Sequence, residues 1–187
     1  MIKEYSDLLK INAGRARSMD KIVTALFELI KSKPYAQITV SEICAQARVA
    51  RKTFYRNFES KDAVVVLKMD RIFMDFSGKY DFTNVDARSM YVYWYEYLLA
   101  DKPFASIFTD RGLFELIVNK VVGYAEIVME DTLHSLASFE PALAEYYLRF
   151  LGLGIASTMS LWIKNGCKTP VKTMAALTDR LLSGVIA

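Results

Sequence analysis

Apolar residues recur every three or four positions along most of the chain, which is the pattern of helices that bury one face. In residues 16–32 this face includes Ile22, Leu26 and Leu29. The repeat stops before Pro34, because the residue that precedes a proline avoids the helical region. No segment combines period-two alternation with β-branched enrichment, so the pattern predicts an all-α fold.

The same periodicity continues beyond residue 60. A loop is expected over residues 77–87, where Gly, Asn and Asp favour turns. Three prolines stand close to predicted helix starts, where the missing N–H costs least. The helices expected here cover residues 61–76, 88–100, 103–109, 111–133, 140–165 and 170–185.

Two short helical patterns with a tight break between them occupy ITVSEICAQARVARKTFYRNFESKDAV, residues 38–64. Thr39 is a suitable N-cap for the first, and Glu42, three residues later, completes the signature of a capping box. A helix-turn-helix needs an apolar inner side that fixes the second helix against the first. The residues expected to face inward are Ile43, Ala47, Val49 and Phe54.

The outer side of the second short helix is basic and polar, as a helix that enters the major groove requires. Arginine can bond two acceptors of guanine, and the methyl group of threonine can contact thymine. Hydroxyl groups, ammonium groups and helix N-termini bind phosphates. The candidate DNA contacts are Thr39, Arg48, Arg51, Lys52, Thr53, Tyr55, Arg56 and Lys61.

The charge distribution supports this interpretation better than the net charge of +3 does. Residues 15–61 hold ten Lys or Arg against four Asp or Glu, whereas residues 62–187 hold twelve against fifteen. A basic segment on a mildly acidic body is typical of proteins that bind nucleic acid. The alternative is that these are solvated helices of a bundle without a nucleic-acid role.

Residues 19–65 resemble the DNA-binding domain of TetR/AcrR-family transcriptional regulators. The resemblance rests on Thr-Phe-Tyr at 53–55, on Phe58 and on Lys61. It implies that Tyr55 and Lys61 hold phosphates and that residues 51–56 read bases.

Two positions depart from the family pattern. Arg48 stands in the turn where the family often has glycine, and a positive φ there costs a non-glycine residue on the order of 1 kcal/mol. Ala50 stands where the family often has serine, which removes a side-chain cap worth about 1 kcal/mol. Both departures leave the exact base contacts open.

Aromatic residues are dense in the predicted helix 88–100, where Tyr91, Trp94 and Tyr95 share a face. Aromatic walls with polar tips suit an organic ligand, although an aromatic-rich core explains them equally well. The resemblance favours a ligand site, since the family usually senses small molecules in this domain. The candidate ligand contacts are Tyr91, Trp94, Tyr95, Phe108, Tyr124 and Met129.

The last two predicted helices carry wide apolar faces with small residues such as Gly152 and Gly154 among them. By resemblance, two such helices from each protomer form a four-helix homodimer interface. Packing within one chain is the alternative. Dimerisation is favoured because paired half-sites multiply the specificity for DNA.

Other classes of protein lack support in the sequence. One histidine, His134, and no catalytic or metal-ligand constellation argue against an enzyme, a metal site or a cofactor. Cys44 and Cys167 are far apart and are expected to be reduced thiols. Without an apolar run of about 20 residues or a secretory leader, a cytoplasmic protein is expected.

The expected organisation is a three-helix helix-turn-helix domain in residues 1–60, with an ordered core from about residue 16, joined to a helical ligand-binding and dimerisation domain in residues 61–187. The expected function is a transcriptional repressor released from its operator by a small organic effector that moves helix 61–76. The alternatives are an activator or co-activator, and a helical protein-interaction module without a ligand.

Overall fold

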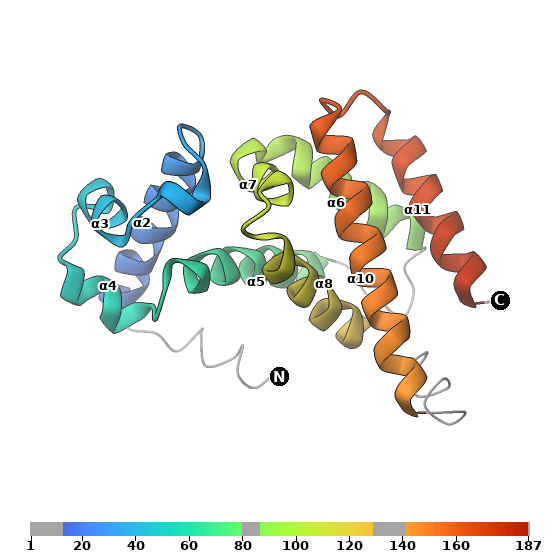
Figure 1. Ribbon diagram of the computed structural model, residues 1–187, viewed down its shortest axis with the longest axis horizontal. Coiled ribbons are helices and arrows are strands. Elements are labelled where there is room, and N and C mark those ends of the chain that lie inside the picture. The colour runs from blue at the N-terminus through green and yellow to red at the C-terminus, as the bar shows by residue number, and fades with distance from the viewer. Residues whose placement is uncertain (1–12, 80–86, 129–140, 187) are drawn as a thin grey trace. The chain divides into compact units, whose positions relative to one another are not determined.

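The computed structural model describes residues 13–79, 87–128 and 141–186, and these ranges contain helices and turns but no strand (Figure 1). The predicted all-α fold is confirmed. The α-helices are α2 (Ala13–Ile30), α3 (Val40–Ala47), α4 (Arg51–Asn57), α5 (Lys61–Lys79), α6 (Ala87–Ala100), α7 (Lys102–Ser106), α8 (Phe114–Val128), α10 (Pro141–Lys164) and α11 (Val171–Ile186), and two 3-10 turns are η1 (Tyr35–Gln37) and η2 (Ile107–Thr109).

The chain forms two compact units, Met1–Lys68 and Met69–Ala187, and α5 contributes residues to both. The domain boundary predicted from the sequence lies between residues 60 and 61. The division after Lys68 places the first turns of α5 with the N-terminal unit, and Val64 and Val65 in these turns are fully enclosed.

In the N-terminal unit, α2 packs against both α3 and α4. Of the predicted apolar face of α2, Ile22 and Leu26 are fully enclosed, whereas Leu29 is half-buried. Ile43 of α3 and Phe54 of α4 complete this core and are also fully enclosed. A small core of this kind fixes the orientation of α4, which is what a helix that reads DNA requires.

Two predicted helices of the C-terminal unit differ in detail. The segment expected as one helix over residues 103–109 is a short α7 followed by η2. The helix expected from residue 111 begins at Phe114, because the Asp110 carboxylate accepts a hydrogen bond from the Gly112 N–H at 2.8 Å and holds a turn. The loop expected over residues 77–87 is helical at both ends, since α5 continues to Lys79 and α6 begins at Ala87. Residues 80–86, and the part of the helix prediction beyond Val128, lie outside the described residues.

In the C-terminal unit, α10 packs against α8 and α11 packs against α6. Gly152 permits the first contact, since a Cβ atom there would lie 2.5 Å from the Val122 side chain. Tyr95 of α6 joins the two pairs, because its hydroxyl lies 2.9 Å from that of Thr178 and its ring packs edge-on against Trp162. Among the described residues, no helix is long and apolar enough to cross a membrane.

Candidate functional site

A capping box fixes the start of α3, as the sequence predicts. The Thr39 hydroxyl accepts a hydrogen bond from the Glu42 N–H at 3.3 Å, and the Glu42 carboxylate accepts one from the Thr39 N–H at 2.9 Å. The Lys33 ammonium also bonds this carboxylate. These contacts, with that of Lys33 the largest, lower the pKa of Glu42 to about 2 from its ordinary value near 4.5. Glu42 therefore stays ionised and keeps the cap in place down to acidic pH.

The turn between α3 and α4 runs through Arg48, whose backbone is left-handed with φ 54° and ψ 48°. The positive φ considered possible from the sequence is therefore adopted without glycine. The Val49 N–H donates to the Cys44 carbonyl at 3.0 Å, so the orphan carbonyls at the end of α3 gain partners. The turn sends the chain directly into α4, with the Arg48 side chain exposed.

Helix α4 has one buried and one exposed side. Phe54 is enclosed. Its ring meets that of Tyr55 edge-on, with centroids 5.4 Å apart, and lies tilted against that of Phe58, with centroids 5.8 Å apart. Tyr55 is 52% exposed, so its hydroxyl is accessible from outside. The N-cap residue Ala50 makes no side-chain hydrogen bond, as expected from its missing hydroxyl. The exposed cations Arg51, Lys52 and Arg56 together form the outer face of α4.

Three other predicted DNA contacts differ from the outer face of α4 in their surroundings. Thr53 is only partly exposed, and Thr39 and Lys61 make hydrogen bonds within the protein. The Thr39 hydroxyl lies 2.8 Å from a Glu42 carboxylate oxygen. The Lys61 ammonium donates to the carbonyls of Tyr35 and Ile38 at 2.8 and 2.9 Å. These two bonds use two of its three N–H groups and tie the start of α5 to η1. A phosphate contact by Thr39 or Lys61 stays a prediction.

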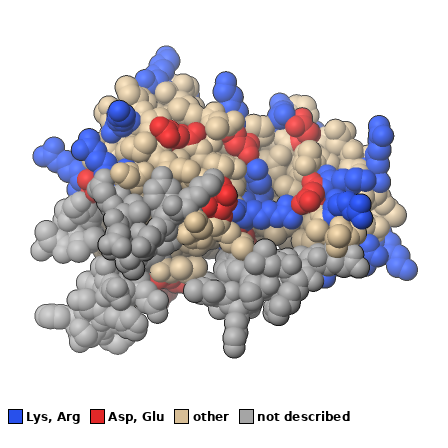
Figure 2. Space-filling view, turned by 180° about the vertical axis from the view of Figure 1, so that it is seen from behind, with Lys and Arg blue, Asp and Glu red and all other residues tan. Residues whose placement is uncertain are grey.

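One polar link to α4 was not assigned from the sequence. Arg15 in α2 donates to the side-chain carbonyl of Asn57 at 3.1 Å, and the Asn57 amide donates to the Thr53 carbonyl at 2.7 Å. The link holds the end of α4 against α2. A basic residue at the start of the first amphipathic helix was the available signal. In Figure 2, Lys and Arg side chains project from the molecular surface, as solvated cations do.

Most of the aromatic residues considered for a ligand site are tied into the protein instead. The Tyr95 hydroxyl bonds Thr178, the Tyr124 hydroxyl donates to Asp70 at 2.9 Å, and the Trp94 N–H points to the Met159 sulfur at 3.2 Å. Their polar tips thus have partners without a ligand.

Tyr91 is partly buried in the C-terminal unit. This burial, with a smaller contribution from the Asp179 carboxylate, raises the pKa of Tyr91 to about 12. Its hydroxyl is therefore protonated at neutral pH. Met129 lies outside the described residues. The ligand contacts assigned to Tyr91 and Met129 stay predictions.

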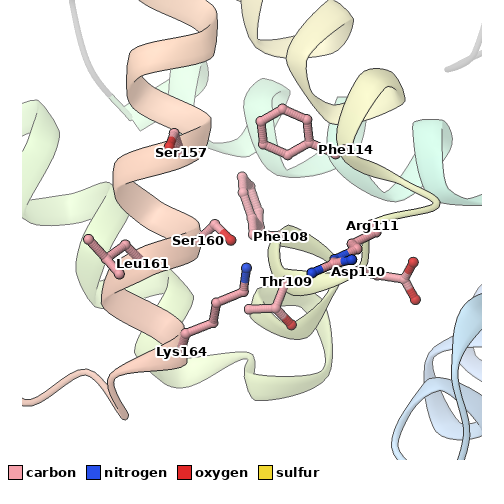
Figure 3. A pocket seen from close by; sticks show the side chains of 9 residues that line it. All are labelled: Phe108, Thr109, Asp110, Arg111, Phe114, Ser157, Ser160, Leu161 and Lys164. Carbon is pink, nitrogen blue, oxygen red and sulfur yellow. The ribbon is translucent and has the colours of Figure 1, made fainter.

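A cavity of about 430 Å³ opens elsewhere in the C-terminal unit, between η2, the turn after it, and α10 (Figure 3). Of the described ligand candidates, only Phe108 lines it. The other lining residues were not assigned from the sequence, because they come from segments about fifty positions apart. They are Thr109, Asp110, Arg111, Phe114, Ser157, Ser160, Leu161 and Lys164.

Comparisons with known proteins agree with this architecture. A family model described as bacterial regulatory proteins, tetR family, matches residues 22–66. A second, described as transcriptional regulator C-terminal region, matches residues 86–184, which is more than half of the chain. The chain belongs to the TetR family of bacterial regulatory proteins. The predicted function as a DNA-binding transcriptional regulator is thereby confirmed.

Solved structures share the fold at 18% identity. A TetR transcriptional regulator from Streptococcus agalactiae 2603V has a TM-score of 0.64, with 90% of this chain and 94% of that chain covered. FadR from Bacillus subtilis in complex with stearoyl-CoA has a TM-score of 0.58, with 87% and 96% covered. The dihydroxyacetone kinase operon activator DhaS has a TM-score of 0.58, with 90% and 96% covered. A search of curated protein sequences found no match.

Proposed function

We propose that this regulator binds operator DNA as a homodimer through the outer face of α4, and that a small organic molecule in the C-terminal unit releases it. The observation that carries the DNA-binding part is the division of α4 into a buried Phe54 and exposed Arg51, Lys52 and Arg56. A cationic face on a rigidly anchored helix can enter a major groove without loss of the fold. Because bacterial DNA lies in the cytoplasm, binding to operator DNA would make this a cytoplasmic protein.

Exposed apolar residues support the homodimer. Tyr146 and Phe150 of α10 are 74% and 63% exposed, and Leu177 and Leu181 of α11 are exposed as well. A monomer would leave these large side chains in water, at a cost of about 25 cal/mol per Å² of apolar surface. The two helices run in opposite directions (Figure 1), so a second copy can complete a four-helix interface.

Two observations support the effector part of the proposal: a structural neighbour with a bound ligand, and a cavity in the C-terminal unit. FadR from Bacillus subtilis, similar in fold, was solved with stearoyl-CoA. The C-terminal unit of this chain has a cavity of about 430 Å³, within the range of small-molecule sites. An effector acts by favouring one of two arrangements of the regulator, and only the arrangement that fits the operator binds DNA.

Pull-down of fragmented genomic DNA from the host with the purified protein, followed by sequencing and footprinting, tests the DNA-binding part. We expect one or a few sites with two-fold symmetry. About eight phosphate contacts by a dimer would give a slope near −7 for the logarithm of affinity against that of salt concentration. Enrichment without sequence preference, or binding that does not depend on salt, would contradict the proposal.

Activation is the second candidate, because the neighbour DhaS is an operon activator. A reporter gene behind the recovered site distinguishes the two. Higher expression in a strain without the regulator indicates repression, and lower expression indicates activation.

A further inference from the structure

The cavity in the C-terminal unit brings two cations together. Arg111 follows η2 and Lys164 ends α10, and Figure 3 shows both charged heads directed to the cavity from opposite walls, with Thr109 between them. Neither side chain makes an ion pair or hydrogen bond within the described part of the chain. The two positive charges are therefore available to a molecule in the cavity.

The one carboxylate at the cavity does not neutralise this pair. Asp110 accepts a hydrogen bond from the Gly112 N–H and points away from the two cationic heads in Figure 3. With one negative and two positive charges, the lining has a net charge of +1. This local excess lies in a part of the chain, residues 62–187, in which acidic residues outnumber basic ones.

Ser160 provides an independent observation. Its side chain is on α10, the residue is only 6% exposed, and its hydroxyl points into the cavity (Figure 3). A serine inside a helix commonly bonds the carbonyl four residues earlier. Within the described residues, the Ser160 hydroxyl makes no hydrogen bond, and its oxygen is open to the cavity rather than sealed in the core. A bound acceptor atom would satisfy it.

Apart from Ser157, the rest of the lining is apolar. The rings of Phe108 and Phe114 lie above the cationic heads in Figure 3. Leu161 of α10 also lines the cavity. A volume of about 430 Å³ suits a small organic molecule rather than an inorganic ion. The cavity therefore offers an aromatic surface for a carbon skeleton and cations plus a hydroxyl for one charged end.

We infer that this cavity binds a small organic anion, with its carboxylate or phosphate group between Arg111, Lys164 and Ser160 and its apolar body against Phe108 and Phe114. Carboxylates and phosphates share the property that matters, since both accept several charge-assisted hydrogen bonds. The inference rests on the proposed function in one respect, because it gives the effector site of that proposal a position and a chemical class.

Isothermal titration of the full chain with three phenyl compounds tests the inference. The probes are 3-phenylpropionate, phenyl phosphate and the neutral 3-phenylpropionamide. We expect at least one anion to bind about tenfold more tightly than the amide, and its affinity to fall with added salt. The stronger of the two anions identifies the head group.

Variants locate the site. Arg111→Gln/Lys164→Gln should weaken the bound anion about tenfold and leave the amide unchanged, whereas Lys168→Gln/Lys172→Gln, two exposed lysines outside the cavity, should bind as wild type. Ser160→Ala should weaken binding about threefold without lowering the melting temperature, because no hydrogen bond within the protein is lost. Circular dichroism verifies that each variant folds.

Three results would overturn the inference: no binding of either anion, equal binding of anion and amide, or unchanged anion binding by the Arg111/Lys164 variant. Operator binding is measured separately on the same proteins, so that a failure of the anion site can be distinguished from a failure of the proposed function. Loss of anion binding with intact DNA binding rejects the site alone. A wild-type protein that binds anions but no specific DNA rejects the proposed function alone.

Discussion

The two units use positive charge in opposite ways. In the N-terminal unit, Arg51, Lys52 and Arg56 project from one short helix that a buried phenylalanine anchors. In the C-terminal unit, Arg111 and Lys164 come from separate elements and face one another across a cavity. A projecting row of cations suits an extended polyanion, whereas a facing pair suits one small anion. Spatial arrangement, rather than the amount of charge, thus separates the two proposed partners.

The largest effect is expected from substitutions on the outer face of α4, which test the difference between the two cationic surfaces. We expect Arg51→Ala/Lys52→Ala/Arg56→Ala to lower operator affinity by about 1000-fold or more, since each lost base or phosphate contact costs roughly 1–3 kcal/mol. Gel shifts with the recovered operator measure the change. Lys168→Ala/Lys172→Ala/Arg180→Ala removes as many exposed cations from the other unit and should leave affinity unchanged. Equal losses in both triple variants would mean that charge number alone matters.

A second pair of substitutions tests whether the C-terminal unit forms the dimer interface in addition to the cavity. Phe150→Glu/Leu181→Glu places charges on the exposed apolar faces of α10 and α11, and burying an unpaired carboxylate costs several kcal/mol. We expect a monomer at micromolar concentration by light scattering, and weaker operator binding. Glu145→Gln/Lys172→Gln, on exposed positions of the same helices, is the control and should remain dimeric. A dimeric double-glutamate variant would place the interface elsewhere.

The turn before α4 allows a smaller and sharper test. Arg48→Gly should stabilise the protein by about 1 kcal/mol, because glycine adopts the left-handed conformation at Arg48 without strain. Arg48→Ala removes the same side chain but keeps the strain, so it should not stabilise. Urea denaturation measures both variants. If both variants bind the operator equally well but less tightly than wild type, the Arg48 guanidinium contacts DNA. If Arg48→Gly does not stabilise the protein, the argument from backbone strain is wrong.

The smallest effect is expected on the stability of the protein as the pH is lowered. Glu42 has its pKa lowered to about 2, so its ionised form favours the folded state above pH 4.5 and this contribution is lost as the pH falls from about 4.5 towards 2. Glu42→Gln keeps a capping side chain without the charge and should lose less stability over that interval. Thermal melts at pH 6, 4 and 2.5 measure the difference. Parallel pH profiles of the two proteins would show that Glu42 does not contribute.

The sequence predicted the N-terminal unit in more detail than the C-terminal one. The capping box of Thr39 and Glu42, the turn at Arg48 and the buried Phe54 follow from spacings of three to six residues, which local backbone geometry enforces. The cavity has no such signature. Arg111 and Lys164 become neighbours only through the packing of α8 and η2 against α10, which periodicity does not specify.

The aromatic candidates show the same limit. Tyr91, Trp94 and Tyr95 do share a helix, as predicted, but periodicity could not tell which partners their polar tips would find. Hydrogen bonds to Thr178 and Asp70 fill the polar requirements of Tyr95 and Tyr124 within the unit. In this chain, Tyr95 and Tyr124 therefore belong to a packed interior and not to a binding wall.

Leu161 belongs to two surfaces at once. It borders the cavity and, at 60% exposure, continues the apolar face of α10 that a second copy is proposed to cover. In the proposed dimer, any substitution that reshapes this rim for a different effector would also alter the surface that the neighbouring protomer meets. Among relatives of this chain, a change of effector preference should therefore coincide with compensating replacements across the α10 and α11 surface, and directed evolution for a new inducer should select for both together.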